Sequence, residues 1–77
     1  MNKLRRTNIE NLKQQIYDLR SEIEILRDEE QEYYNNMPEN LQSSDKAMKA
    51  EQAISSIDDA INYLDDVIDS LDEAIEQ

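Results

Sequence analysis

Two stretches of the chain repeat apolar residues in alternating steps of three and four positions. The first runs from Ile9 to Leu26 and keeps its rhythm to Tyr33, and the second runs from Ala50 to Ile75. A seven-residue period is typical of helices packed along an apolar stripe, here with isoleucine favoured at the first apolar position of each heptad (a) and leucine at the second (d). The pattern predicts two long helices, over about residues 3–35 and 44–76.

The pattern breaks only over about residues 36–43, which include the single proline, Pro38. The residue before a proline is pushed out of the helical region, and Ser43 or Ser44 is suited to cap the next helix. A connection this short makes the helices antiparallel neighbours. The predicted fold is all-α, a single antiparallel two-helix coiled-coil hairpin over residues 1–77. The same pairing between two chains would give an extended dimer instead.

Both the apolar residues and the charges suggest a register for the two helices. Antiparallel pairing of a with d residues sets Ile9 level with Leu71 and Ile16 level with Leu64, with Asn40 as the pivot. The e positions are basic in the first helix and acidic in the second. The expected pairs are Arg6 with Asp72, Lys13 with Asp65, Arg20 with Asp58, and Arg27 with Glu51. Such charges favour one direction and register, unless they are only a solvated surface.

The other flank of the predicted hairpin carries more apolar surface than a two-helix seam uses. The g positions of the second helix are small and apolar, and other apolar residues lie near them at c positions. The candidate partner-binding residues are Leu4, Ile25, Ala53, Ala60, Tyr63, Val67 and Ala74. Such a surplus indicates docking on a protein partner or dimerisation into a four-helix bundle, unless the stems of Gln15 and Glu22 cover it. We expect the homodimer first, because a lone two-helix hairpin has a thin core.

Two further surfaces are alternative sites. The predicted tip gathers Tyr33, Tyr34, Met37 and Leu41, which either pack the turn or insert into a pocket of a partner. Acidic residues repeat along the outside of the second helix, where Asp59, Asp66, Asp69 and Glu73 form an alternative acidic face. A rigid rod with carboxylates at each heptad can imitate a phosphate backbone, although a solvated helix face is the simpler interpretation.

Composition excludes several kinds of site. The chain has 8 basic and 19 acidic residues and a net charge of −11, which disfavours direct binding of nucleic acid or anionic lipid. It has no cysteine, histidine or glycine, so thiolate or imidazole metal sites and glycine-rich phosphate loops are absent. We expect no catalytic, metal or cofactor site. No apolar run approaches a membrane span, and no signal-peptide core follows Met1, so the expected location is the cytoplasm.

The stretch from Asp28 to Ser44, followed by alternating alanines, isoleucines and acids, resembles a group of short uncharacterised acidic helical-hairpin proteins of bacterial phages and mobile elements. The resemblance covers about residues 28–75, and Met37–Gln42 is its most specific part. It implies no particular activity. It does imply a phage or mobile-element context, in which small acidic proteins often obstruct a host protein. From the residues themselves, the expected function is protein–protein interaction, and an inhibitor of a host protein is the alternative.

Overall fold

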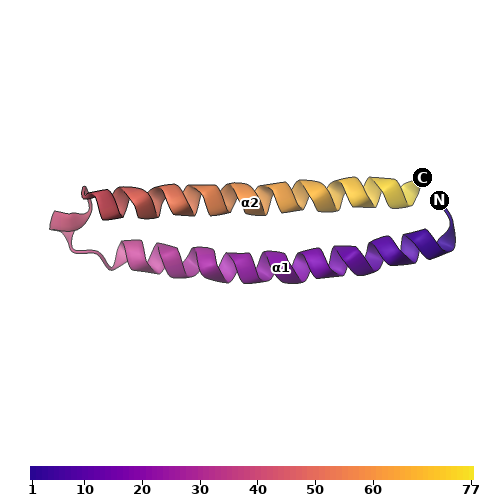
Figure 1. Cartoon of the computed structure of the whole chain (residues 1–77), viewed down its shortest axis with the longest axis horizontal. Coiled ribbons are helices and arrows are strands. Elements are labelled where there is room, and N and C mark those ends of the chain that lie inside the picture. Colours follow the sequence, from indigo (N-terminus) through magenta and orange to yellow (C-terminus); the bar gives the residue numbers. More distant parts are fainter.

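The chain folds into two long helices joined by a short connection. A computed structural model describes all 77 residues and contains no strands. Helix α1 spans Lys3–Asn35, a single 3₁₀ turn (η1) spans Glu39–Leu41, and helix α2 spans Asp45–Glu76 (Figure 1). The fold is therefore all-α, an antiparallel two-helix hairpin closed within one chain, as the heptad pattern predicts.

Local capping explains where the helices begin. The side-chain oxygen of Asn2 accepts a hydrogen bond from the backbone N–H of Arg5 at 2.8 Å, and Ser44 does the same for Ala47 at 3.3 Å. Both side chains satisfy an N–H group that has no partner within its helix. After α1 ends, Pro38 adopts an extended conformation, which turns the chain towards η1.

The hairpin is a thin rod. Its Cα atoms extend 59 × 15 × 11 Å along the principal axes, and the two termini lie side by side at the end opposite the tip (Figure 1). There the amino group of Met1 donates a hydrogen bond to the backbone carbonyl of Gln77 at 2.8 Å. A rod only two helices wide has little interior.

The small core lies almost entirely on one helix. Five residues of the whole chain are buried, all of them on α2: Ala47, Ala50, Ile54, Ile61 and Ile68. All but Ala50 occupy a positions. Helix α1 has no buried residue, and its a residues, such as Ile16 and Ile23, are only half-buried. The seam thus consists of the a positions of both helices and the d positions of α2.

The d leucines of α1 differ from expectation. Leu12, Leu19 and Leu26 keep 52%, 54% and 58% of their surface exposed. The heptad pattern predicts that a and d residues share the seam equally, and within one chain this is wrong. The d residues of α2, Ile57, Leu64 and Leu71, are half-buried, so the d edge that turns out of the seam is that of α1, and it leaves a long row of apolar residues exposed.

Candidate functional site: an open apolar face opposite an ion-pair ladder

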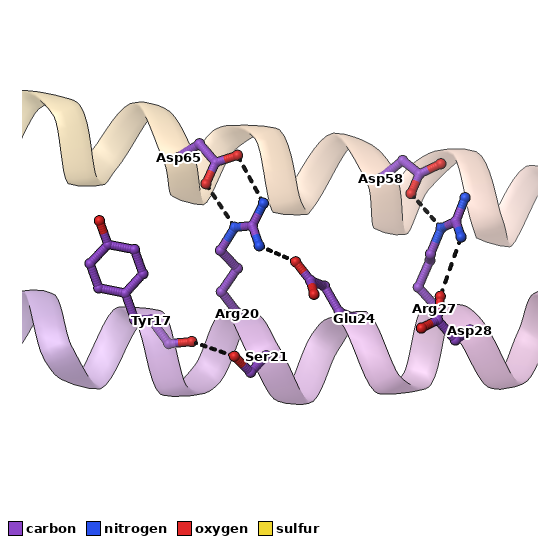
Figure 2. A network of polar contacts seen from close by, with 8 residues as sticks. All are labelled: Tyr17, Arg20, Ser21, Glu24, Arg27, Asp28, Asp58 and Asp65. Carbon is purple, nitrogen blue, oxygen red and sulfur yellow. Dashed lines mark hydrogen bonds and ion pairs between the residues drawn. The ribbon is translucent and has the colours of Figure 1, made fainter.

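Ion pairs between e positions cover one side of the seam. The Arg20 guanidinium donates to both carboxylate oxygens of Asp65, Nε at 2.7 Å and Nη2 at 3.1 Å, and also pairs with Glu24 (Figure 2). One heptad along, Arg27 Nε donates to Asp58 Oδ1 at 2.8 Å. Lys13 pairs with Asp72, and the hydroxyl of Tyr34 donates to Glu51 at the tip end. These four contacts form the ladder.

The ladder corrects the predicted register. The cations and acids are those expected, but each acid is one heptad further along α2: Arg20 meets Asp65, not Asp58. Arg6, expected to pair with Asp72, instead donates to the backbone carbonyl of Ile75 at 3.2 Å. Helical side chains lean towards the N-terminus of their own helix. In an antiparallel pair, two side chains therefore meet when the Cα atom of each lies slightly beyond the level of the other, towards the C-terminus of its own helix. Pairing by residue number does not take this lean into account.

The burial pattern agrees with the position of the ladder. The most buried isoleucines of α2, Ile54, Ile61 and Ile68, all occupy a positions, and the a isoleucines of α1 are half-buried. The a edges therefore lie in the seam beside the ladder. The opposite side of the seam has no charged pairs to cover it.

The carboxylates of the ladder stabilise the charged form of its cations. The hydrogen bond to Asp65 raises the pKa of Arg20 above its ordinary value; desolvation opposes this, and attraction to Asp65 and Glu24 adds to the rise. The pKa values of Lys13 and Arg27 are raised in the same way by their hydrogen bonds to aspartates. These groups stay charged at neutral pH, so the ladder closes its side of the rod.

The opposite side is the open face, which we define by its residues. It consists of the d edge of α1 with the g and neighbouring c positions of both helices. Its members are Leu4, Leu12, Leu19, Ile25, Leu26 and Tyr33 of α1 with Ala53, Ala60, Tyr63, Val67 and Ala74 of α2. Leu4 and Tyr63 are the most exposed members, at 69% and 68%, and Val67 is the least exposed of the large residues, at 43%. The three g alanines are half-buried.

The open face, as defined, takes in all seven residues of the predicted binding flank and adds the exposed leucines at 12, 19 and 26, which the heptad pattern assigns to the seam. A signal for them exists in the sequence: charges flank the seam at e but not at the g positions of α2. A ladder on one edge only pulls the helices together at that edge and opens the other.

Polar g residues of α1 border the open face. Gln15 and Glu22, the g residues of α1 expected to cover the small residues of α2, are both exposed, and neither makes a hydrogen bond or an ion pair. Glu29, the next g residue, is exposed and without an ion pair as well. The apolar surface is therefore bordered by free polar groups, as docking surfaces commonly are.

The four residues predicted to cluster at the tip do not all lie together. Tyr33, Met37 and Leu41 line a hollow of about 670 Å³ together with Pro38 and Lys46. Tyr34 does not line it, because its hydroxyl belongs to the ladder. Tyr33 and Leu41 remain about half exposed. Since Tyr33 occupies the last d position of α1, the hollow continues the open face at its tip end.

The acidic face lies on the outside of α2. Asp59, Asp66, Asp69 and Glu73 are all exposed, and no cation pairs with them. No group of three or more carboxylates converges to share a metal ion. Their neighbours in sequence, such as Asp58 and Asp65, are taken by the ladder.

Comparison with known proteins adds no relative to this picture. The chain matches no protein-family model, no curated protein and no solved structure. Neither helix contains an apolar stretch long enough to span a lipid bilayer. Any functional proposal therefore rests on the two faces of the rod.

Proposed function

We propose that this chain is a non-catalytic, cytoplasmic protein–protein interaction module that docks helices of a protein partner, or of itself, on its open face. The observation that carries the proposal is the row of half-exposed leucines at 12, 19 and 26, beside the small residues of α2. Contiguous apolar surface is rare on monomeric proteins beyond a few hundred Å², and larger patches mark interaction sites.

The thin core supports the proposal. Only five residues are buried, and full burial of a leucine side chain is worth roughly 1.5–3 kcal/mol. Because the three d leucines are about half exposed, about half of that stabilisation is not realised within the hairpin. Docking a helix on the face would recover it, because apolar area removed from water stabilises an association as it stabilises a fold.

The shape of the face suits a helix. Leucines on α1 stand beside a row of alanines and one valine on α2, which makes a long surface with a raised edge and a lower edge. Small residues allow close approach of helix backbones, whereas large apolar residues supply contact area. Tyr63 and Tyr33, which are exposed, add aromatic groups of the kind that anchor interfaces.

Site-specific photo-crosslinking in cells tests the proposal. Benzoylphenylalanine replaces Val67 on the open face in one variant and Tyr17 in a second. Tyr17 is a matched control because it is 46% exposed and lies on the ladder side, beside Arg20 (Figure 2). We expect discrete protein adducts from position 67 and not from position 17. Adducts from position 17 alone, or from neither position, would contradict the proposal.

A second candidate is an inhibitor of phage or mobile-element origin that occupies the nucleic-acid-binding groove of a host protein. It is favoured by the free carboxylates of Asp59, Asp66 and Glu73, spaced one heptad apart on the outside of α2. Replacing these three by lysine should abolish that inhibition while the ladder and helices persist. The same triple variant should leave crosslinking through position 67 unchanged if the open face is the working surface.

A further inference from the structure

We infer that the open face is covered by a second copy of this chain, packed so that both hairpin tips lie at the same end of a four-helix bundle. This inference rests on the proposed function, because it names the occupant of the same face. In this arrangement a two-fold axis runs along the rod between the copies, and α1 of each copy packs against α2 of the other.

The broad side of the rod that carries the open face has room for a stable dimer. The Cα atoms of the rod extend 59 by 15 Å on that side, a product of about 900 Å². Specific interfaces bury about 800 Å² per partner, so the two copies would contact one another along most of the rod.

The two helices of the face are complementary in size. Contacts in the ladder set Arg20 across from Asp65 and Arg27 across from Asp58, so Leu19 comes next to Val67 in level and Leu26 next to Ala60. A two-fold axis along the rod preserves these levels across the dimer. Each α1 leucine then faces one small residue of the partner's α2, so large residues pack against small ones.

The opposite arrangement, with tips at opposite ends, lacks this fit. Its two-fold axis crosses the rod and packs α1 against α1 and α2 against α2. Leucines would then meet leucines near Leu19, whereas alanines would meet alanines on the other side.

Unpaired charges at the border of the face agree with the tips-together arrangement. Lys46 and Lys49 of α2 and Glu29 and Glu32 of α1 are all exposed and make no ion pair within the hairpin. With α1 against α2 of the other copy, Glu32 comes within about one helical turn of the level of Lys49 across the interface. The hollow at the tip, lined by Tyr33 and Lys46, lies at the same border.

Solution mass and one distance test the inference together. The chain has no cysteine, so Asn40→Cys gives each copy a single spin label at the exposed tip. We expect sedimentation equilibrium to give a dimer at tens of micromolar. Pulsed electron spin resonance should give a tip-to-tip distance of roughly 10–20 Å plus the label arms, as expected for helices packed 8–10 Å apart. A dimer with labels separated by about the 59 Å length of the rod would overturn the arrangement. A monomer would overturn the second copy as occupant.

Paired variants separate this inference from the proposed function. Val67→Glu adds a charge to the open face, and Tyr17→Glu adds the same charge to the ladder side at similar exposure. We expect Val67→Glu to weaken dimerisation at least tenfold with its helical circular dichroism retained, and Tyr17→Glu to leave it unchanged. A wild-type monomer whose position 67 still crosslinks to a different protein overturns the second copy and leaves the proposed function standing. A dimer insensitive to Val67→Glu overturns both.

Discussion

At the scale of single residues, the ladder depends on which way side chains lean. Arg20 makes two hydrogen bonds to Asp65, a forked geometry that fixes both groups more tightly than a single contact between point charges would. Exposed ion pairs add little to stability, so the main effect of the ladder is to set the register of α1 against α2.

A double-mutant cycle tests this register. We expect Arg20→Gln and Asp65→Asn to show a coupling free energy in thermal unfolding, because each variant alone removes the same contact. The matched cycle of Arg20→Gln with Asp58→Asn should show none, since Asp58 belongs to Arg27. Coupling in the second cycle and not in the first would restore the register predicted from residue numbers.

The Tyr34–Glu51 contact predicts a loss of stability at alkaline pH. The hydrogen bond to Glu51 raises the pKa of Tyr34 above its ordinary value of 10.0, with desolvation acting in the same direction. A folded-state pKa above the unfolded one means that the contact stabilises below the unfolded pKa and is lost as pH rises through the folded one.

Thermal melts between about pH 9 and about pH 11 measure this loss. The wild type should lose more stability across that range than Tyr34→Phe, which has no phenol to titrate. A complementary nuclear magnetic resonance titration should show the pKa of Tyr34 fall towards its ordinary value in Glu51→Gln. Equal slopes for wild type and Tyr34→Phe would mean that the contact is not made in solution.

At the scale of helices, α1 and α2 contribute unequally to the fold. Helix α2 supplies every buried residue, whereas α1 supplies the cations of the ladder and the exposed leucines. The fold class follows from the heptad pattern because the period of three and four specifies helices, and Pro38 with its flanking asparagines specifies where they stop. The rotation of each helix about its axis does not follow from the period. An a residue such as Ile16 and a d residue such as Leu19 are equally apolar, so the pattern does not tell which of them is more buried.

That inequality predicts different costs for two alanine substitutions. Ile61 is 8% exposed, so Ile61→Ala should cost about 2–5 kcal/mol, the usual range for a buried aliphatic residue. Leu19 is 54% exposed, so Leu19→Ala in dilute solution should cost about 1 kcal/mol, near half the value of a fully buried leucine. Urea unfolding of the two variants, followed by circular dichroism, gives both numbers. Equal costs in dilute solution would mean that the d edge is as buried as the a edge.

At the scale of the whole molecule, the heptad pattern predicts the hairpin and part of the open face, but not the full extent of that face. Val67 and Tyr63 are recognisable because apolar residues at g and c exceed what a seam requires. Leu12 and Leu26 are not, because their exposure depends on the one-sided ladder, which is a property of both helices in register. The occupant depends in turn on how two whole faces match, a comparison that the sequence of one chain does not contain.

Net charge gives a last prediction for the dimer. Each chain carries −11, so two rods packed along their length repel one another, and only a few border pairs such as Glu32 with Lys49 oppose this. The Debye screening length falls from about 30 Å at 0.01 M salt to about 8 Å at 0.15 M. This weakens the long-range repulsion between the rods more than it weakens contacts inside the apolar face. Raising salt across this range should therefore lower the dimer dissociation constant several-fold in sedimentation equilibrium. A dimer that weakens with salt would instead be held by its border ion pairs, and the leucine rows would not be its main source of affinity.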